Sequence, residues 1–366
     1  MSGLATAPSL IAVGFASAMV LWYGHRKRRT IWHPMSTWWN KRTALLENSR
    51  LDELLIITDF DATITTGDSI QCHDMLGFSE LMTPAFRHDF APLLDWASNP
   101  ATDGVHWCAL SGNGSGGSKQ GPSPRCSRPH PPLACLCRWD RAHELCIQHG
   151  QPPRHLIPRM VRETRMQPRP GALKLLARLA ALEVPVLIVS AGLSDVIEEF
   201  LRQHDALTEN ITVCSNRLNY GADSAPQSVS PDPPITSFTK DTAYRASSAF
   251  FRQHQKRTKL IVIGDSCSDV DAATNVPHNH ALSVGFLNGK EIHNASAVRH
   301  LQTYDAIVLG HDGSLEPVDA IIDQIASNDR TVGSSMLSRM QRSVSEEESR
   351  RVSQPTPLRA TSQRGD

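Results

Sequence analysis

Residues 54–63 read LLIITDFDAT, a short apolar run that ends in two aspartates separated by one residue. The run at 54–57 is rich in leucine and isoleucine and too short for a typical helix, so it predicts a β-strand buried on both faces. Three further runs have the same form, at residues 186–189, 260–263 and 307–309. Between the runs lie stretches with helical spacing, such as 173–182 and 196–201. This alternation predicts an α/β fold with a doubly wound parallel sheet.

Length and charge limit the classes of protein that fit. The chain has 366 residues, which suggests about two domains or one domain with long appendages. Lysine plus arginine and aspartate plus glutamate each number 37, so the formal charge is zero and no basic field for a nucleic acid polymer is expected. Eight cysteines are too few for a disulfide scaffold of this length, which favours a reduced, cytosol-facing catalytic portion.

The N-terminal segment predicts a membrane anchor. Residues 1–24 contain no charged side chain, residues 10–23 are almost continuously apolar, and a basic collar follows at 26–29. A helix over 3–24 would span about 33 Å, enough for the hydrocarbon core of a bilayer. A cleaved signal peptide, in which positive charges precede the apolar stretch, and a buried helix are the alternatives. The basic collar then places the remaining chain in the cytosol.

The other boundaries follow from composition. Residues 30–50 are expected to be a linker with a short amphipathic piece. The bounds of the catalytic core, 51–65 and 168–326, are those that a family resemblance described below implies. Residues 108–138 are dominated by glycine, serine, proline and cysteine without periodicity, so they predict a loop or disordered insert. The polar tail 327–366 is also expected to be disordered.

Polar residues follow each predicted strand, at the edge of the sheet where α/β proteins bind ligands. Asp59 and Asp61 follow the first run, Ser190, Ala191 and Gly192 follow the second, and Asp265 and Asp269 follow the third; Lys240 lies between the last two runs. Individually these residues fit turns, helix caps or surface positions. Their common placement at strand ends, in a workable order, favours one active site.

Phosphoryl transfer to an aspartate uses this set of groups. One carboxylate attacks phosphorus, a second protonates the leaving oxygen, and a divalent cation offsets the repulsion between nucleophile and phosphate. Ser190, the backbone N–H groups of Ala191 and Gly192, and the ammonium of Lys240 can neutralise the transferring oxygens. A site built from carboxylate oxygens favours Mg²⁺ over zinc.

The sequence resembles the haloacid dehalogenase superfamily of aspartate-nucleophile phosphatases, and within it the pyrimidine 5'-nucleotidase family, which includes cytosolic 5'-nucleotidase III. The stretches that carry the resemblance run in order from about Leu54 to Ile325: IITDFDAT, VPVLIVSAGLSDVIEEFLRQ, VCSN, IVIGDSCSD, VGFLN and YDAIVLGHDGSLEPVDAIIDQI. The resemblance implies a haloacid dehalogenase-like sheet with a helical cap inserted after the first strand, at residues 66–167.

The resemblance also implies a role for each site residue. Asp59 would be the nucleophile and Asp61 the general acid and base. Asp59, the backbone carbonyl of Asp61 and Asp265 would hold Mg²⁺, with Asp269 supporting the metal site. Ser190 and Lys240 would bind the phosphate.

The expected cap differs from the family's pattern. If residues 108–138 are removed, Val105-His106-Trp107 joins Trp139 and resembles the family's aromatic helix. Trp107 and Trp139 are then candidates to stack on a nucleobase, or else two buried cap aromatics. The acidic residue with which the family reads the base is not identifiable. The segment 108–138 is therefore interpreted either as a disordered loop or, preferably, as an untranslated intervening segment.

These observations predict an Mg²⁺-dependent 5'-nucleotidase for pyrimidine nucleotides or 7-methylguanosine monophosphate, tethered to a membrane by its N-terminal helix. One alternative is a haloacid dehalogenase-type phosphatase for another small phosphate ester, because the cap sets specificity. The other is a membrane-anchored scaffold with an inactive phosphatase domain.

Overall fold

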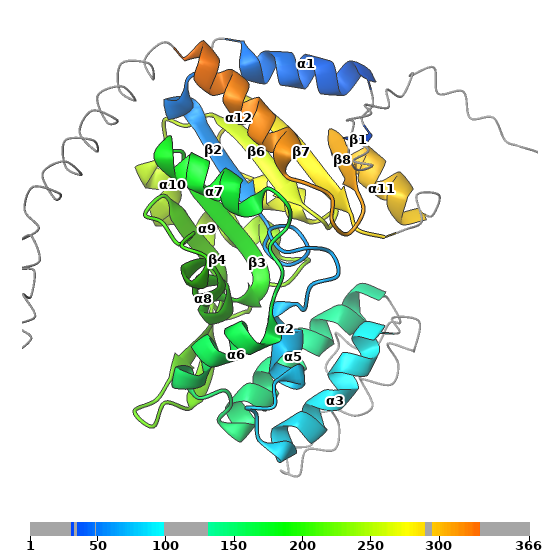
Figure 1. Cartoon of the computed structure of the whole chain (residues 1–366), viewed down its shortest axis with the longest axis vertical. Helices are drawn as coiled ribbons and strands as arrows, with labels where there is room; N and C mark the ends of the chain where they lie inside the picture. Colours follow the sequence, from blue (N-terminus) through cyan, green and yellow to red (C-terminus); the bar gives the residue numbers. More distant parts are fainter. Residues whose placement is uncertain (1–30, 33–34, 48, 99–130, 290–294, 330–366) are drawn as a thin grey trace, which may run out of the picture.

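The sheet at the centre of the molecule has eight strands in the order β1-β8-β7-β6-β2-β3-β4-β5 (Figure 1). The computed structural model describes residues 31–32, 35–47, 49–98, 131–289 and 295–329. The six central strands are parallel: β2 (Leu54–Thr58), β3 (Val186–Leu193), β4 (Ile211–Tyr220), β6 (Lys259–Gly264), β7 (His280–Leu287) and β8 (Ala306–Leu309). The edge strands β1 (Ile31–Trp32) and β5 (Pro226–Ser230) are antiparallel to their neighbours. All four strands predicted from apolar runs are present.

Helices cover both faces of the sheet. Successive residues of β2 face opposite layers, with Leu54 and Ile56 in one apolar cluster and Leu55 and Ile57 in another. The first cluster lies under α1 (Met35–Leu46), α7 (Ala172–Ala181), α8 (Ser194–Gln203) and α12 (Glu316–Asn328). The opposite face carries the 3₁₀ turns η4 (Lys240–Thr242) and η5 (Asp269–Ala273) and the helices α9 (Ala243–Ala246), α10 (Ser248–Gln253) and α11 (Ala295–Thr303).

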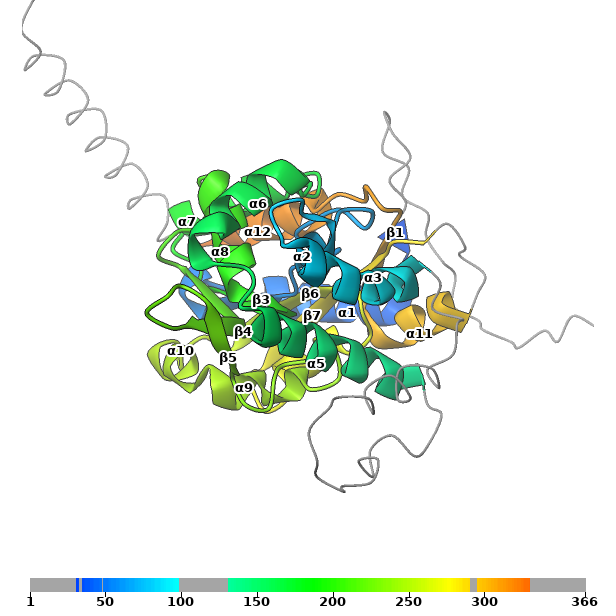
Figure 2. The ribbon, with the colours of Figure 1, turned by 90° about the horizontal axis from the view of Figure 1, so that it is seen from below.

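A separate group of helices lies beyond the carboxyl ends of the strands (Figures 1 and 2). It contains α2 (Cys72–Phe78), α3 (Pro84–Ser98), α5 (Pro131–His149) and α6 (Ile157–Thr164). The chain enters and leaves this cap through two paired linkers, in which Thr66 N donates to the Gln167 carbonyl (3.0 Å) and Arg169 N to that of Ile64 (2.8 Å). The structure confirms the predicted α/β class, a doubly wound parallel sheet with a helical cap inserted after β2, the strand that leads to Asp59.

Three predicted segments differ from the structure or are only partly described. The expected linker 30–50 is integrated into the fold, because β1 pairs with β8 and α1 buries Trp38 and Leu45 against the core. Of the expected insert, residues 131–138 are the first two turns of α5 rather than a loop, and 108–130 lie outside the described residues. At the other end, the Asp329 carboxylate accepts a hydrogen bond from Leu51 N (2.8 Å), so the fold continues to residue 329.

The rest of the predicted tail, residues 330–366, lies outside the described part of the chain, as does the predicted membrane anchor, residues 1–29. Within the described residues, every helix is too short or too polar to cross a bilayer.

Candidate active site

Asp59 follows the last residue of β2, and its side chain is buried near Lys240 of η4 and Asp269 of η5. Its backbone N–H donates to the Ile263 carbonyl of β6 (2.9 Å), which continues the ladder by one residue and fixes its position. The Lys240 ammonium lies 2.5 Å from Asp59 Oδ1 and 2.6 Å from Asp269 Oδ1. Asp59 and Asp269 lie 181 and 29 positions from Lys240 in the sequence, yet the three side chains meet at one point. The sequence analysis expected these residues at one edge of the sheet.

Three carboxylates form a cluster suited to a hard cation. One oxygen from each of Asp59, Asp265 and Asp269 lies within 4.8 Å of the others. Burial raises the pKa of Asp59 to about 6, with Lys240 opposing the shift and Asp269 adding to it. Burial and the same neighbouring carboxylates raise the pKa of Asp265 well above its usual range. Buried carboxylates crowded in this way need positive charge, and an all-oxygen donor set fits Mg²⁺.

Within this cluster Asp269 has a supporting position. Its Oδ2 accepts hydrogen bonds from the backbone N–H groups of Asp265 and Ser266, both at 2.8 Å, and its Oδ1 accepts from Lys240. A Cβ on Gly264 would lie 2.2 Å from Asp269 Oδ2, so this fold-back of the side chain requires glycine at the end of β6. Asp59 and Asp265 are therefore the side chains best placed to hold a cation, and Asp269 shapes the loop that presents Asp265.

Asp61 points away from the cluster and toward the cap. Its Oδ1 accepts a hydrogen bond from the backbone N–H of Cys72 (3.1 Å), the first residue of α2. Its Oδ2 lies on the Gly192 side, where an added Cβ would lie 3.1 Å from that oxygen and 2.9 Å from Cys72 Sγ. Burial, followed by the charge of Asp59, raises the pKa of Asp61 to about 7. A carboxyl group that exchanges a proton near neutrality suits acid and base catalysis.

The irregular carboxyl-terminal part of β3, where its pairing with β4 shifts register between Val189 and Leu193, holds the predicted phosphate-binding groups. Ser190 is buried, and its Oγ accepts a hydrogen bond from Gly192 N (3.0 Å). Asn216 Nδ2 donates to the Ala191 carbonyl (2.9 Å) and also pairs in both directions with the backbone of Ile235 at 2.8 Å. Asn216 thus ties the Ser190 loop to the segment that leads to Lys240. Sequence reasoning gave it no role, because β4 is a mixed polar and apolar strand and the burial of Asn216 is visible only in the structure.

The aromatic residues predicted to contact a base lie in the cap. Trp139 on α5 is 8% exposed, with the His73 ring 4.1 Å away and the Arg138 guanidinium 4.4 Å from its ring centre. Trp107 lies outside the described residues. His73 follows Cys72 on α2, so two consecutive residues of α2 lie between Trp139 and the Asp61 carboxyl. Among the described residues, the buried indole Nε1 of Trp139 has no hydrogen-bond partner.

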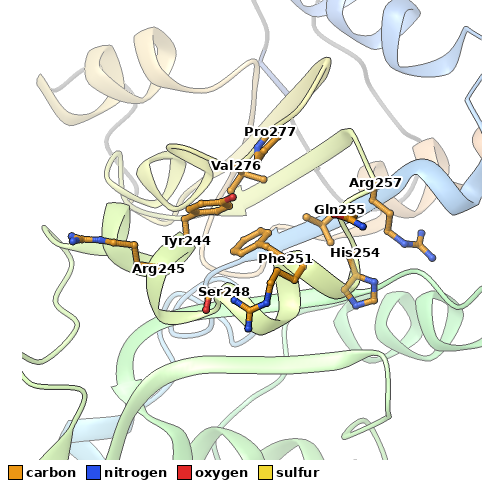
Figure 3. A pocket seen from close by; sticks show the side chains of 11 residues that line it. Tyr244, Arg245, Ser248, Phe251, His254, Gln255, Arg257, Val276 and Pro277 are labelled. Atoms are coloured by element: carbon orange, nitrogen blue, oxygen red, sulfur yellow. The ribbon is translucent and has the colours of Figure 1, made fainter.

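A cavity of about 410 Å³ lies elsewhere, at the amino ends of β2 and β6 (Figure 3). The rings of Tyr244 and Phe251 and the side chain of Val276 line it. Arg257, at its border, donates to the carbonyls of Leu51 and Leu54 (2.7 and 2.8 Å). None of the predicted site residues lines this cavity, so it is separate from the carboxylate cluster.

Comparison with known proteins agrees with this geometry. The model of the family described as pyrimidine 5'-nucleotidase (UMPH-1) matches residues 135–326, more than half of the chain. A 7-methylguanosine phosphate-specific 5'-nucleotidase from Gallus gallus is 36% identical over 51% of this chain and 63% of its own length. The Homo sapiens protein of that name is 32% identical over 51% of this chain and 61% of its own length.

Among solved structures, cytosolic 5'-nucleotidase IIIB bound to cytidine is similar with a TM-score of 0.58 and 20% identity, over 79% of this chain and 90% of that one. The match shows the shared fold. The aligned regions of the two sequence relatives cover less than two thirds of each relative's length.

The chain belongs to the pyrimidine 5'-nucleotidase family. The matched region includes Ser190, Lys240, Asp265 and Asp269 but not β2 with Asp59 and Asp61. The two N-terminal aspartates are therefore placed in the candidate site by the geometry of the strand ends.

Proposed function

We propose that the protein is an Mg²⁺-dependent 5'-nucleotidase that hydrolyses nucleoside 5'-monophosphates through a phosphoenzyme on Asp59. The observation that carries the proposal is the position of the Asp59 carboxylate, buried between the Lys240 ammonium and the carboxylates of Asp265 and Asp269. A nucleophilic carboxylate needs positive charge on either side before an anionic phosphate can approach it.

Asp59, Asp265 and the backbone carbonyl of Asp61 would hold the Mg²⁺ ion, with Asp269 in support. When bound, the ion offsets the repulsion between the nucleophile and the phosphate oxygens. Lys240, Ser190 Oγ and the N–H groups of Ala191 and Gly192 bind the non-reacting oxygens and stabilise their charge in the transition state.

The chemistry then takes two steps. Asp59 forms a bond to phosphorus as the bond to the ester oxygen breaks, and the Asp61 carboxyl donates its proton to the departing nucleoside oxygen. The Asp61 carboxylate next removes a proton from water, the resulting oxygen attacks phosphorus, and Asp59 is released with inorganic phosphate. The pKa of about 7 on Asp61 fits both directions of proton transfer.

The family and the names of the relatives support pyrimidine nucleotides and 7-methylguanosine monophosphate as the substrates to test first. Trp139 and Trp107 are the proposed stacking partners of the base.

The experiment is phosphate release from CMP, UMP, 7-methylguanosine monophosphate, AMP and phosphoserine, with Mg²⁺ and with EDTA. We expect Mg²⁺-dependent release from at least one nucleotide and little from phosphoserine. Asp59→Asn should lower turnover by at least about 10³-fold because the amide is not a nucleophile, whereas Asp52→Asn, at an exposed aspartate, should leave it unchanged. Substantial turnover by the Asp59 variant would refute the phosphoenzyme mechanism, and exclusive hydrolysis of phosphoserine would refute the substrate class.

We also propose that residues 1–29 tether the enzyme to a membrane with its catalytic domain in the cytosol. The proposal rests on the uncharged segment 1–24 and the basic collar 26–29. The full chain should sediment with membranes at high salt, and a chain lacking 1–29 should stay in the supernatant with equal turnover. Sedimentation of the shortened chain would assign membrane binding to another surface.

A further inference from the structure

Arg169 lies where the chain returns from the cap to the core, and its side chain is 1% exposed. Its neighbour Pro168 bridges to Thr65, and its own backbone N–H donates to the Ile64 carbonyl. The side chain therefore passes beneath the linker through which the chain enters the cap. A fully buried cation in this place needs an explanation, since desolvating a guanidinium is costly unless its donors are paired.

The guanidinium uses all five of its N–H donors. Nε donates to the Thr63 carbonyl (2.7 Å), and Nη1 donates to the carbonyls of Gly313 (2.9 Å) and His311 (3.2 Å). Nη2 donates to the Ala62 carbonyl and to Asn288 Oδ1, the latter at 2.8 Å. These acceptors come from the loops that follow β2, β7 and β8. One rigid, planar group thus fixes three loops at the catalytic edge of the sheet.

The loop after β2 carries the proposed chemistry, and the loop after β7 contacts it through Asn288. Ala62 follows Asp61 directly and has a φ of +58°, a conformation that a residue with a side chain adopts at a cost and that surrounding contacts must maintain. Asn288 Nδ2 donates to the same Ala62 carbonyl (2.9 Å) and lies 3.4 Å from Asp265 Oδ2. Arg169 and Asn288 together connect the turn after Asp61 to the carboxylate of Asp265.

The surroundings of Arg169 differ from those of a stabilising ion pair. Within the described residues, no carboxylate lies within ion-pair distance of it, and the Phe286 ring covers the guanidinium at 3.9 Å. Burial lowers its pKa to about 10, so the group stays charged at neutral pH. Its charge is balanced by backbone carbonyl dipoles and, beyond ion-pair distance, by the carboxylates of Asp265, Asp312 and Asp68, which favours a role in loop geometry.

We propose that Arg169 is a positioning residue for phosphoryl transfer, which holds the turn after Asp61 in register with Asn288 and Asp265. This inference rests on the function proposed above for Asp59, Asp61 and Asp265. Lysine carries its three donors on a single nitrogen, whereas arginine spreads five donors over a planar fork. Arg169→Lys therefore cannot reproduce the hydrogen bonds to all three loops.

The matched control is Arg257→Lys. Arg257 also donates to three backbone carbonyls, those of Leu51, Leu54 and Glu183, but at the opposite end of the sheet. Both variants should lose stability. Only Arg169→Lys should lower kcat, by about 10²-fold at equal fraction folded, because misplacing a reacting group by about 1 Å has that effect.

Two further readouts separate positioning from stability. Calorimetry of the nucleotide-free protein should show weaker Mg²⁺ binding for Arg169→Lys than for Arg257→Lys. The loss of kcat should be non-additive with that of Asn288→Ala, because both side chains bind the Ala62 carbonyl.

Equal kcat and equal Mg²⁺ affinity in the two lysine variants would overturn the proposal for Arg169. The proposed function would still stand in that case, provided that the wild-type enzyme hydrolyses a nucleotide. If the wild type hydrolyses none of the phosphate esters, the proposed function fails, and the Mg²⁺ affinities alone then decide whether Arg169 organises this edge of the sheet.

Discussion

The carboxyls of Asp59 and Asp61 are two residues apart, yet they have different surroundings. Asp59 contacts the Lys240 ammonium, whereas Asp61 contacts the backbone N–H and the thiol of Cys72 at the start of α2. Their pKa values are raised to about 6 and about 7 respectively, so near neutral pH Asp59 is the more ionised of the two. Different surroundings thus suit two chemically identical groups to the proposed roles of nucleophile and acid.

The acid role of Asp61 predicts a dependence on the leaving group. Asp61→Asn should lower kcat for a nucleoside monophosphate by about 10²–10³-fold, because its alkoxide leaving group needs a proton. The loss for p-nitrophenyl phosphate should be at least tenfold smaller, since nitrophenolate departs without one. Steady-state kinetics on both substrates test this, with Asp52→Asn as the control. An equal loss on both would assign Asp61 to structure or to metal binding.

Most of the candidate site residues predicted from the sequence share one property: they follow an apolar run that is recognisable alone, whereas Lys240 lies between two such runs. Asp59, Asp61, Ser190 and Asp265 were predicted in this way. Asn216, Asn288 and Arg169 were given no role, because their importance comes from partners far along the chain, such as Ala62, which is 107 positions from Arg169. A single buried polar residue has no local pattern by which its distant partner can be inferred.

At the scale of elements, the apolar strands buried on both faces were predicted, whereas the strands that contain both polar and apolar residues were not. β2 and β6 are buried throughout, and each reads as a continuous apolar run. β4 contains Asn216, Arg217 and Asn219, and β7 begins with a histidine and contains a serine and a glycine. Neither has the continuous apolar run nor the strict alternation that marks a strand. The sheet's class was therefore predictable, while its full width was not.

Two buried histidines join the cap helices α2 and α5. His73 Nε2 and His143 Nε2 are 3.0 Å apart, and His143 Nδ1 is buried without a partner. Burial lowers the pKa of His143 to about 4, and burial together with His143 and Arg138 lowers that of His73 well below its usual range. The nearby carboxylate of Asp74 is paired with Arg138, so it does not stabilise a protonated imidazole. Both imidazoles are therefore held neutral.

This pair predicts an acid-sensitive cap. The folded-state pKa of His143 is below its unfolded value of 6.5, so the unfolded chain binds the proton first and stability falls as pH decreases from about 6.5 to 4. The loss attributable to His143 should approach ~3 kcal/mol. Denaturant unfolding at pH 7.5 and pH 4.5 should show a smaller pH dependence for His143→Gln than for the wild type.

The exposed residue His155 supplies the control, since His155→Gln should keep the wild-type pH dependence. If His143→Gln also keeps it, the acid sensitivity arises at other groups.

At the scale of the whole molecule, core and cap are joined by two short linkers that pair with each other. Residues 64–66 lie antiparallel to 167–169, and Gly67 packs so closely on Asn288 that an added Cβ would lie 2.4 Å from its side chain. The predicted boundaries of the core, at 65 and 168, fall within this pairing. They were predicted from the resemblance to the family, whose cap is inserted between the first and second motifs.

The segment 108–138 is the largest departure from the family's pattern, and the structure adds a reason to divide it. The family match begins at residue 135, near the segment's end. Arg138, its last residue, is buried, ion-pairs with Asp74 and donates through Nε to the Leu93 carbonyl (3.0 Å). If the segment is an intervening one, Trp107 takes the place of Arg138 on the helix, directly before Trp139. If it is a loop, Arg138 belongs to the native cap.

Two shortened chains distinguish these interpretations, one lacking 108–130 and one lacking 108–138. We expect the mature protein to lack the segment, because a break within a cap helix loses hydrogen bonds and packing. Mass spectrometry of the native protein should then find no peptide from residues 112–125, and the chain lacking 108–138 should be at least as stable as either longer one.

The opposite result has a definite signature. A loop costs little closure entropy, so removing 108–130 would change stability only slightly. Removing 108–138 would leave the Asp74 carboxylate without its guanidinium in a buried site, at a cost of about 3 kcal/mol or more. That difference between the two shortened chains, together with the 112–125 peptide at normal abundance, would establish the segment as part of the folded enzyme, with α5 beginning at Pro131 as its anchor.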